Sequence, residues 1–158
     1  MPILSISVLG PLSVTRDGAP IRTFKYNKAR ALLAYLAVEA GRPHPRAELC
    51  ALLWPDLSEY AARRNLTQVL SALRDVLTDD DGPSWLLTDV ETVRLNEDLS
   101  LIVDVRSFDR LLADSERHGH RSWQTCGTCS ERLEEALALY RGDFLSQLTV
   151  ADSAPFEE

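Results

Sequence analysis

The sequence has no long hydrophobic run, and its 158 residues include only seven glycines and three cysteines. No stretch reaches the roughly 20 apolar residues that a membrane-spanning helix needs, and no basic-then-apolar leader opens the chain. No two glycines have the spacing of a GxGxxG or Walker phosphate loop, and no serine lies in a GxSxG elbow. We therefore expect a cytoplasmic protein that is not an enzyme and does not enter a membrane.

Negative charge dominates the chain but is unevenly distributed. The net charge is −7 at pH 7, which argues against sequence-blind binding of nucleic acid. Between residues 16 and 74, however, ten Lys and Arg residues outnumber five Asp and Glu residues. Residues 75–99 hold one Arg against eight acidic residues, and residues 100–158 hold six against eleven. A short basic run on an acidic protein is typical of selective binding, although charge runs are often plain solvated surface.

The basic run contains an amphipathic segment at residues 59–77, EYAARRNLTQVLSALRDVL. One stripe at helical spacing is apolar and consists of Leu66, Val69, Leu70, Leu73 and Leu77. The remaining surface carries Arg63, Arg64, Asn65, Thr67, Gln68, Ser71 and Arg74. Side chains of these types can reach phosphates and base edges in a DNA major groove. Taken alone, the segment is equally typical of an ordinary helix with one solvated face.

The segments around this helix predict an α+β fold. In chain order they predict strands within residues 3–14 and 19–21, helices over 27–40, 45–54 and 59–77, and strands over 85–88 and 92–95. The Asp17-Gly18 pair is a hairpin signal, and Ser58 is the expected N-cap of the third helix. A small antiparallel sheet, three helices and a hairpin make a winged helix, in which the third helix enters the major groove.

Individual side chains of this winged helix have different expected roles. Arg64 and Gln68 lie one helical turn apart, which suits bidentate contacts to guanine or adenine. Arg63 and Arg74 are better placed to hold phosphates. Arg94, on the hairpin, is expected to reach a phosphate or the minor groove.

For three of the basic residues, an ordinary role on the protein surface is a close alternative to DNA contact. Arg94 suits a surface salt bridge with Glu91 or Asp89 as well as it suits DNA. Lys25 and Lys28, at the start of the first helix, are weaker phosphate candidates, because solubilising surface charge is the commoner role of such lysines.

Beyond residue 98 the pattern becomes helical. Four apolar residues predict one helix that ends near residues 118–119: Val105, Phe108, Leu111 and Leu112. Residues 130–140 predict another, with four side chains buried: Leu133, Ala136, Leu137 and Tyr140. Two such helices look like the start of a helical repeat array, which needs more partners than two helices supply. We expect a domain at residues 1–98, followed at 99–158 by the first helices of a second.

Several segments resemble a known family. The stretches VLGPLSVTRDGAPI, KARALLAYLAVEAGRPHPRAELCALLWPD and ARRNLTQVLSALRDVL resemble the OmpR-like winged-helix domain of SARP/AfsR-type bacterial transcription regulators. DVRSFDRLL and LEEALALYRGDFL resemble the tetratricopeptide-like bacterial transcriptional activator domain (BTAD) that follows it in those proteins. The resemblance implies an activator that binds promoters, with double-stranded DNA, RNA polymerase and a second copy of itself as partners.

A cluster of cysteine and histidine lies between the two C-terminal helices. Cys126 and Cys129 have the spacing of a zinc knuckle, and His118 and His120 would complete a tetrahedral structural zinc site. A loop that binds nothing fits the sequence equally well. A redox pair is disfavoured because no thioredoxin-like βαβ pattern surrounds it, and a disulfide because the chain is expected in the cytoplasm. Cys50 is expected in the core.

The sequence leaves two rival functions open. The acidic net charge favours a protein-interaction module whose winged helix does not itself bind DNA. The cysteine and histidine cluster would allow a zinc-responsive regulator. The Arg, Asn and Gln side chains of residues 59–77 favour DNA binding.

Overall fold

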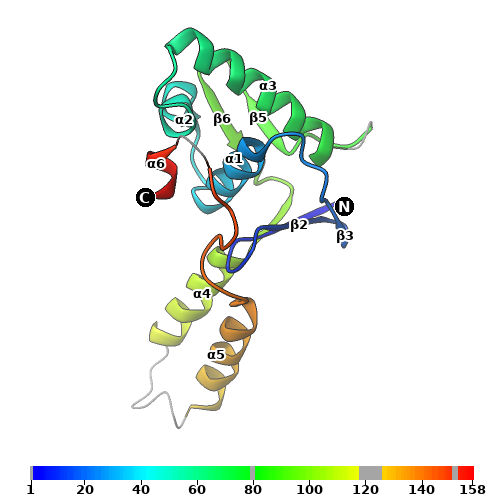
Figure 1. Ribbon diagram of the computed structural model, residues 1–158. Helices are drawn as coiled ribbons and strands as arrows, with labels where there is room; N and C mark the ends of the chain where they lie inside the picture. The colour runs from blue at the N-terminus through cyan, green and yellow to red at the C-terminus, as the bar shows by residue number, and fades with distance from the viewer. Residues whose placement is uncertain (1, 79–80, 118–125, 151–152) are drawn as a thin grey trace.

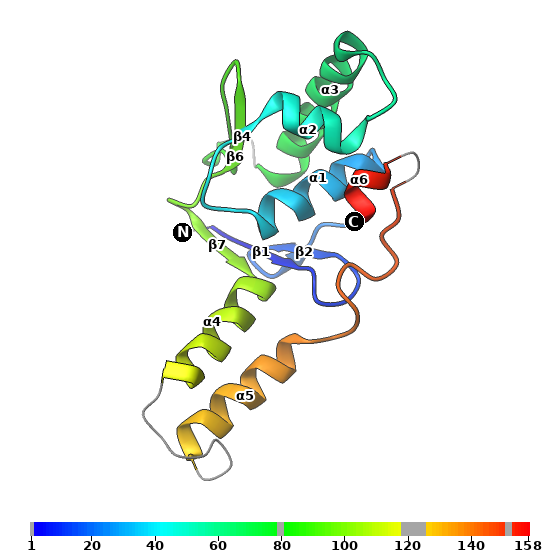
Figure 2. The ribbon, with the colours of Figure 1, turned by 90° about the vertical axis from the view of Figure 1, so that its left-hand side faces the viewer.

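The computed structural model describes residues 2–78, 81–117, 126–150 and 153–158 (Figure 1). The elements follow in this order: β1 (Ile3–Ser7), β2 (Ser13–Arg16), β3 (Ala19–Pro20), α1 (Asn27–Val38), β4 (His44–Pro45), α2 (Arg46–Leu53), α3 (Glu59–Leu77), β5 (Leu86–Thr88), β6 (Thr92–Leu95), β7 (Ser100–Val103), α4 (Asp104–Arg117), α5 (Gly127–Leu139) and α6 (Ala154–Glu157). The fold is mixed α/β, and α4 with α5 forms a helical hairpin that projects from the rest (Figure 2).

The first sheet has the strand order β3-β2-β1-β7. β1 pairs antiparallel with β2 and parallel with β7. Leu4 and Ile6 of β1 are buried because alternate side chains of a strand point to one face. The predicted turn at Asp17-Gly18 is confirmed: both residues have positive φ, 51° and 82°, as a tight two-residue hairpin turn requires.

The second sheet has the order β4-β6-β5, and all its pairs are antiparallel. The predicted hairpin is confirmed as β5 and β6, within one residue at each end. The sequence reading missed β4 and β7. β4 is too short to show a pattern, and β7 pairs with a strand almost a hundred residues away, which no local signal reveals. β7 comes just after the predicted boundary at residue 98 and nevertheless belongs to the first sheet.

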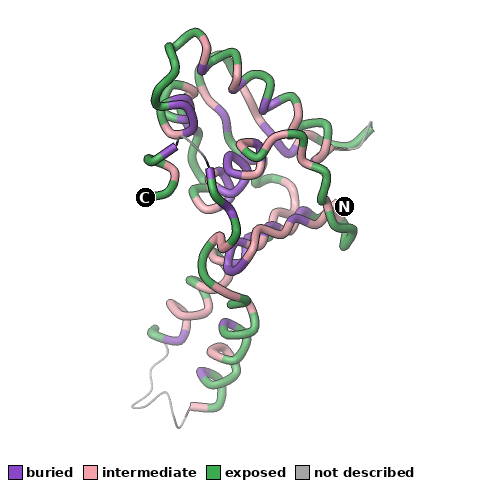
Figure 3. The backbone as a smooth tube through the Cα atoms, in the orientation of Figure 1, coloured by how far each residue is buried: buried purple, intermediate pink, exposed green. Residues whose placement is uncertain are grey.

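The main core lies among α1, α2, α3 and the two sheets, where Figure 3 shows the buried segments. Its largest fully buried side chains include Trp85, Leu36, Leu53, Leu66 and Leu73. Burying a leucine completely contributes roughly 1.5–3 kcal/mol relative to leaving it exposed. The described part of the chain contains no helix long and apolar enough to cross a bilayer.

The burial predicted for the second C-terminal helix is partly wrong. Ala136 is buried and Leu133 is half-buried, but Leu137 is 68% exposed and Tyr140 is 49% exposed. α5 packs mainly against α4, and a single neighbouring helix covers only one stripe of its surface. The helix also begins at Gly127, earlier than the predicted residue 130.

Asp104 joins this helical hairpin to the first sheet. The side chain is only 5% exposed and stands at the first residue of α4. Its Oδ1 accepts hydrogen bonds from the Val8 and Val105 N–H groups, each at 2.8 Å, and its Oδ2 accepts one from the Leu9 N–H at 2.9 Å. A carboxylate at a helix N-terminus is favoured by the helix dipole.

The chain after α5 returns to the α-helical part and covers it. Leu148 and Val150 are buried in the main core. The Asn27 amide donates to the Thr149 carbonyl at 2.6 Å, and the Ser153 hydroxyl donates to the Leu52 carbonyl of α2. α6 then packs against α2, so that the C-terminal segment lies beside helices far from it in sequence (Figure 1).

We predict that Asp104→Ala lowers the free energy of unfolding by about 2–4 kcal/mol, because it leaves buried N–H groups without an acceptor. Urea denaturation followed by circular dichroism measures the change. Asp109→Ala is the matched control, since Asp109 is an exposed acid on the same helix. Equal stability of the two variants would show that the Asp104 bonds are not important for the fold.

Candidate nucleic-acid interface

α3 has the predicted bounds, Glu59–Leu77. The Ser58 hydroxyl caps its N-terminus by accepting a hydrogen bond from the Ala61 N–H at 3.2 Å, as predicted. The predicted stripe is confirmed, because all five of its residues are at most 4% exposed. Burial of this stripe fixes which way the opposite, polar face of α3 points.

Most of the predicted contact residues lie on the solvent side of α3. The exposed ones are Arg63, Arg64, Thr67, Gln68, Ser71 and Arg74. Their local partners differ. Arg63 pairs with Glu59 at 3.3 Å, and the Thr67 hydroxyl donates to the Arg63 carbonyl at 3.0 Å. An exposed ion pair of this kind is worth at most about 1 kcal/mol, so a phosphate can replace Glu59 at little cost.

The β5–β6 hairpin is fixed beside the C-terminal half of α3. The Arg74 guanidinium donates to the Thr88 hydroxyl of β5, so this arginine links helix to hairpin. Arg94 of β6 is exposed and stands opposite Leu87 in the register. The Asp89 carboxylate, its predicted alternative partner, is engaged in the turn instead, where it accepts bonds from the Glu91 and Thr92 N–H groups, both at 2.7 Å.

A shallow hollow of about 410 Å³ lies on the other flank of α3. It is lined by Lys25, Tyr26, Asn27, Lys28, Trp54, Asn65, Gln68 and Val69. Asn65 is half-buried here, on the side of α3 that faces residues 25–28. Lys28 donates to the Leu53 carbonyl and lies 5.1 Å from the centre of the Trp54 ring, so it serves the fold. Lys25 is exposed and is the better phosphate candidate of the two lysines.

Three exposed acidic residues lie near the polar face of α3, and the interface predicted from the sequence did not include them. Asp75 is exposed one helical turn after Ser71, and Asp89 and Glu91 lie at the tip of the hairpin. The four-residue spacing from Ser71 to Asp75 was visible in the sequence. These charges oppose phosphate binding, so the favourable surface is the N-terminal two-thirds of α3.

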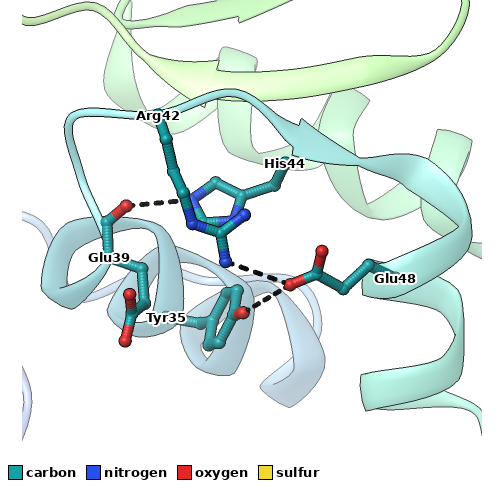
Figure 4. A network of polar contacts seen from close by, with 5 residues as sticks. All are labelled: Tyr35, Glu39, Arg42, His44 and Glu48. Atoms are coloured by element: carbon teal, nitrogen blue, oxygen red, sulfur yellow. Dashed lines mark hydrogen bonds and ion pairs between the residues drawn. The ribbon is translucent and has the colours of Figure 1, made fainter.

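A cluster of polar side chains lies at the junction of α1, β4 and α2 (Figure 4), next to the β5–β6 hairpin with which β4 pairs. Glu48 accepts hydrogen bonds from the Arg42 guanidinium at 3.1 Å and from the Tyr35 hydroxyl at 3.0 Å. Both bonds, of which the one from Arg42 has the larger effect, hold the pKa of the Glu48 carboxyl below its usual value. The pKa of the Tyr35 hydroxyl is raised, and burial is the main cause. Next to them, His44 Nε2 lies 2.9 Å from the Glu39 carbonyl oxygen.

His44 connects this cluster to the hairpin. It is 1% exposed, its ring meets the Tyr35 ring edge-on at 5.3 Å, and in β4 it pairs with Val93 of β6. The same sheet is fastened at the hairpin turn, where the Arg46 N–H donates to the Glu91 carbonyl at 2.7 Å. α1 and α2 therefore determine where the hairpin stands relative to α3.

The predicted zinc site is only partly within the described residues. His118 and His120 lie outside them. Cys126 is half-buried and Cys129 is buried, and neither is in a disulfide. The described ranges contain no group of three or more His, Cys, Asp or Glu side chains that could hold a metal. The zinc site stays a prediction. Cys50 is buried in the main core, as predicted, and burial raises the pKa of its thiol.

The arrangement of small sheet and helices matches that of a solved SARP-type transcriptional regulator. That protein is Mycobacterium tuberculosis EmbR, in a complex with a low-affinity phosphopeptide: the match has a TM-score of 0.72 and 27% identity, and covers 94% of this chain and 38% of that one. The EmbR transcriptional regulatory proteins of Mycobacterium bovis and Mycobacterium tuberculosis are each 35% identical to this chain over 74 residues. These residues make up 47% of this chain and 19% of each EmbR sequence.

These matches confirm the resemblance to SARP-type transcriptional regulators. No protein-family model matches the chain. The chain spans about a fifth of the curated EmbR sequences and under two-fifths of the solved one.

We predict that Asp89→Ala lowers the melting temperature at neutral pH and that this difference narrows once the pH falls below about 3.9. Hydrogen bonds from Glu91 and Thr92 lower the pKa of the Asp89 carboxyl in the folded state. A carboxylate with a lowered folded-state pKa stabilises the protein above its unfolded value of about 3.9, and this contribution is lost as pH falls through the lowered pKa.

Thermal unfolding between neutral pH and roughly pH 3 tests this. Glu91→Ala is the control, because only the backbone of Glu91 takes part in the turn. A difference in melting temperature between the wild type and Asp89→Ala that stays constant with pH would contradict the prediction.

Proposed function

We propose that this chain is the DNA-binding part of a transcriptional regulator, a winged helix that places α3 in the major groove and the β5–β6 hairpin on the flanking backbone. One observation carries the proposal. α3 is buried along one side and presents Arg64, Gln68 and Ser71 to solvent on the other, while the Arg74–Thr88 bond holds the hairpin alongside. A helix held this way can enter the major groove with its polar side facing the base edges.

The neighbouring side chains would divide the contacts among them. Arg64 and Gln68 are suited to base edges, because both are exposed and no hydrogen bond or ion pair in the described chain holds either of them. Arg63 would exchange Glu59 for a phosphate. Lys25 on one flank and Arg94 on the other would contact the backbone on the two sides of the groove.

The larger organisation is also a proposal. We infer a winged-helix domain that ends with β7, a few residues beyond the predicted boundary at residue 98, followed by the first tetratricopeptide-like helices of an activator domain, working in the cytoplasm with RNA polymerase and a second copy of the chain. The match to EmbR supports this assignment through its name and fold. The phosphopeptide is a ligand of the EmbR structure.

A protein-interaction module is the second candidate, and two exposed apolar side chains favour it. Val90 at the tip of the hairpin is 86% exposed, and Tyr60 in the first turn of α3 is 77% exposed. Together with the nearby acidic residues, they would suit a protein surface better than a phosphate backbone. Failure to bind DNA would favour this candidate.

Binding to duplex DNA over a range of salt concentrations tests the proposal. The duplex should come from the region upstream of the gene for this chain, with a scrambled duplex of equal composition as control. We expect preference for the native duplex and affinity that falls steeply with salt, because bound phosphates release counterions. Equal binding to both duplexes would exclude sequence-specific recognition, and no binding at low salt would exclude DNA as the partner of this chain.

We predict that Arg64→Ala weakens binding to the native duplex roughly 5- to 140-fold, the equivalent of about 1–3 kcal/mol for a bidentate base contact. Gln68→Ala should have an effect in the same range. Arg63→Ala should instead weaken both duplexes alike and reduce the salt slope by about 1. Arg110→Ala, an exposed arginine on α4, is the control for loss of charge. If Arg64→Ala behaves like Arg110→Ala, the assigned face of α3 is wrong.

A further inference from the structure

The first sheet has β7 at one edge and β3 at the other. β3 is only two residues long and contains Pro20, whose nitrogen carries no hydrogen, so that edge is protected against further pairing. β7 spans four residues and contains neither proline nor a charged side chain. Among the strands that the structure describes, only β1 pairs with β7, and Figure 2 shows β7 at the rim of the sheet.

The backbone of β7 is suited to pairing with one more strand. Successive residues of a strand turn their N–H and C=O groups to opposite edges, so half of β7 directs these groups away from β1. An edge of this kind is a template for an added strand. One of its N–H groups, that of Leu101, has a local acceptor in the Leu99 carbonyl oxygen at 2.9 Å.

The two faces of the sheet differ beside β7. Leu101 and Val103 stand next to buried residues of β1 in the register, and so they lie on the face that packs on the core. Ile102 points to the other face and is 49% exposed, and Ile3 of β1 on the same face is 42% exposed. An added strand would therefore place alternate side chains beside Leu101 and Val103, and the others beside Ile102.

A hollow of about 420 Å³ lies next to Leu101 and Val103. α4 supplies the rest of its lining with Arg106, Ser107 and Arg110. The two arginines are four residues apart and therefore share one side of α4. None of the described residues that line the hollow is acidic. Side chains that an added strand directs to this face would meet two guanidinium groups and a hydroxyl.

The two guanidinium groups differ in their present partners. Arg106 Nη1 donates to Glu97 Oε1 at 2.7 Å, and both side chains of this ion pair are more than a third exposed. Water screens such a pair, so an incoming carboxylate can replace Glu97 at little cost. Arg110 is exposed, and no hydrogen bond or ion pair in the described chain holds it. The hollow therefore matches carboxylate groups in charge and in hydrogen bonding.

We propose that the β7 edge binds an extended segment of a partner protein as an added strand of the first sheet. The bound segment alternates acidic and apolar residues: its carboxylates enter the hollow at Arg106 and Arg110, and its apolar side chains lie against Ile102. Main-chain hydrogen bonds supply affinity in this mode of recognition, and alternate side chains supply specificity. None of these residues belongs to the contact face of α3, so the site does not depend on the proposed DNA binding.

Peptides of defined sequence test the proposal on the whole chain. The probe is an end-blocked, fluorescently labelled peptide in which valine and glutamate alternate, and fluorescence anisotropy follows its binding. One control peptide has the same composition with valines and glutamates in two separate blocks, and another has lysine in place of glutamate. We expect the alternating acidic peptide to bind and both controls to lose binding. Equal binding of the blocked peptide, or no binding of the alternating one up to roughly 1 mM, would overturn the proposal.

Charge reversal on α4 locates the carboxylates of the bound peptide. Arg110→Glu should weaken binding of the alternating acidic peptide about fivefold or more, since it removes one exposed ion pair and adds a repulsion. Arg117→Glu is the matched control, because this exposed arginine lies in the last turn of α4, outside the hollow. Equal losses in these two variants would indicate general charge attraction and contradict the site. Weaker binding in Arg64→Ala would do so too, by placing the peptide on α3.

Amide hydrogen exchange tests the backbone pairing without a variant. Bound peptide should slow exchange within residues 100–103, because a new strand pairs with the outward N–H groups of β7. The amides of α3 should exchange as before. Unchanged exchange along β7 at saturating peptide would contradict strand addition, even for a peptide that binds.

Discussion

The structure depends on the one-sided burial of α3. Leu66, Leu70 and Leu73 are at most 2% exposed and pack into a core shared with α1, α2 and both sheets. The position of every polar side chain on α3 follows from this, because a rotation about the helix axis would expose leucine and bury arginine. Local interactions also stabilise the two ends of α3. The Ser58 hydroxyl caps the N-terminus, and the acidic Glu59 in the first turn and the basic Arg74 in the last turn complement the helix dipole.

Elements whose signals are local could be predicted from the sequence. The bounds of α3, the Asp17-Gly18 turn and the β5–β6 hairpin follow from periodicity and turn chemistry within a few residues. β7 could not be predicted in this way, because its partner β1 lies almost a hundred residues earlier in the chain. The same holds for Asp104, whose role depends on the Val8 and Leu9 N–H groups.

The candidate interface shows the same division between local and distant information. The sequence placed Arg64, Gln68 and Ser71 on one face, because helical spacing alone decides that. It did not show that Arg74 bonds to Thr88, that Lys28 is held by the Leu53 carbonyl, or that Asn65 turns toward residues 25–28. Each of these depends on which element lies next to α3 in space.

The helical hairpin and the proposed DNA-binding face lie at opposite ends of the molecule, with α3 at one end and α4 and α5 at the other (Figures 1 and 2). The helical hairpin of α4 and α5 is held to the rest of the molecule by Asp104, which bonds the backbone just after β1. It is also held by the segment after α5, which buries Leu148 and Val150 in the main core. A partner that covers the exposed Leu137 side of α5 therefore leaves α3 accessible. The returning segment also accepts a hydrogen bond from Asn27 at the start of α1, next to the hollow beside α3, so the part of the chain that follows the helical hairpin contacts the helices beside the candidate interface.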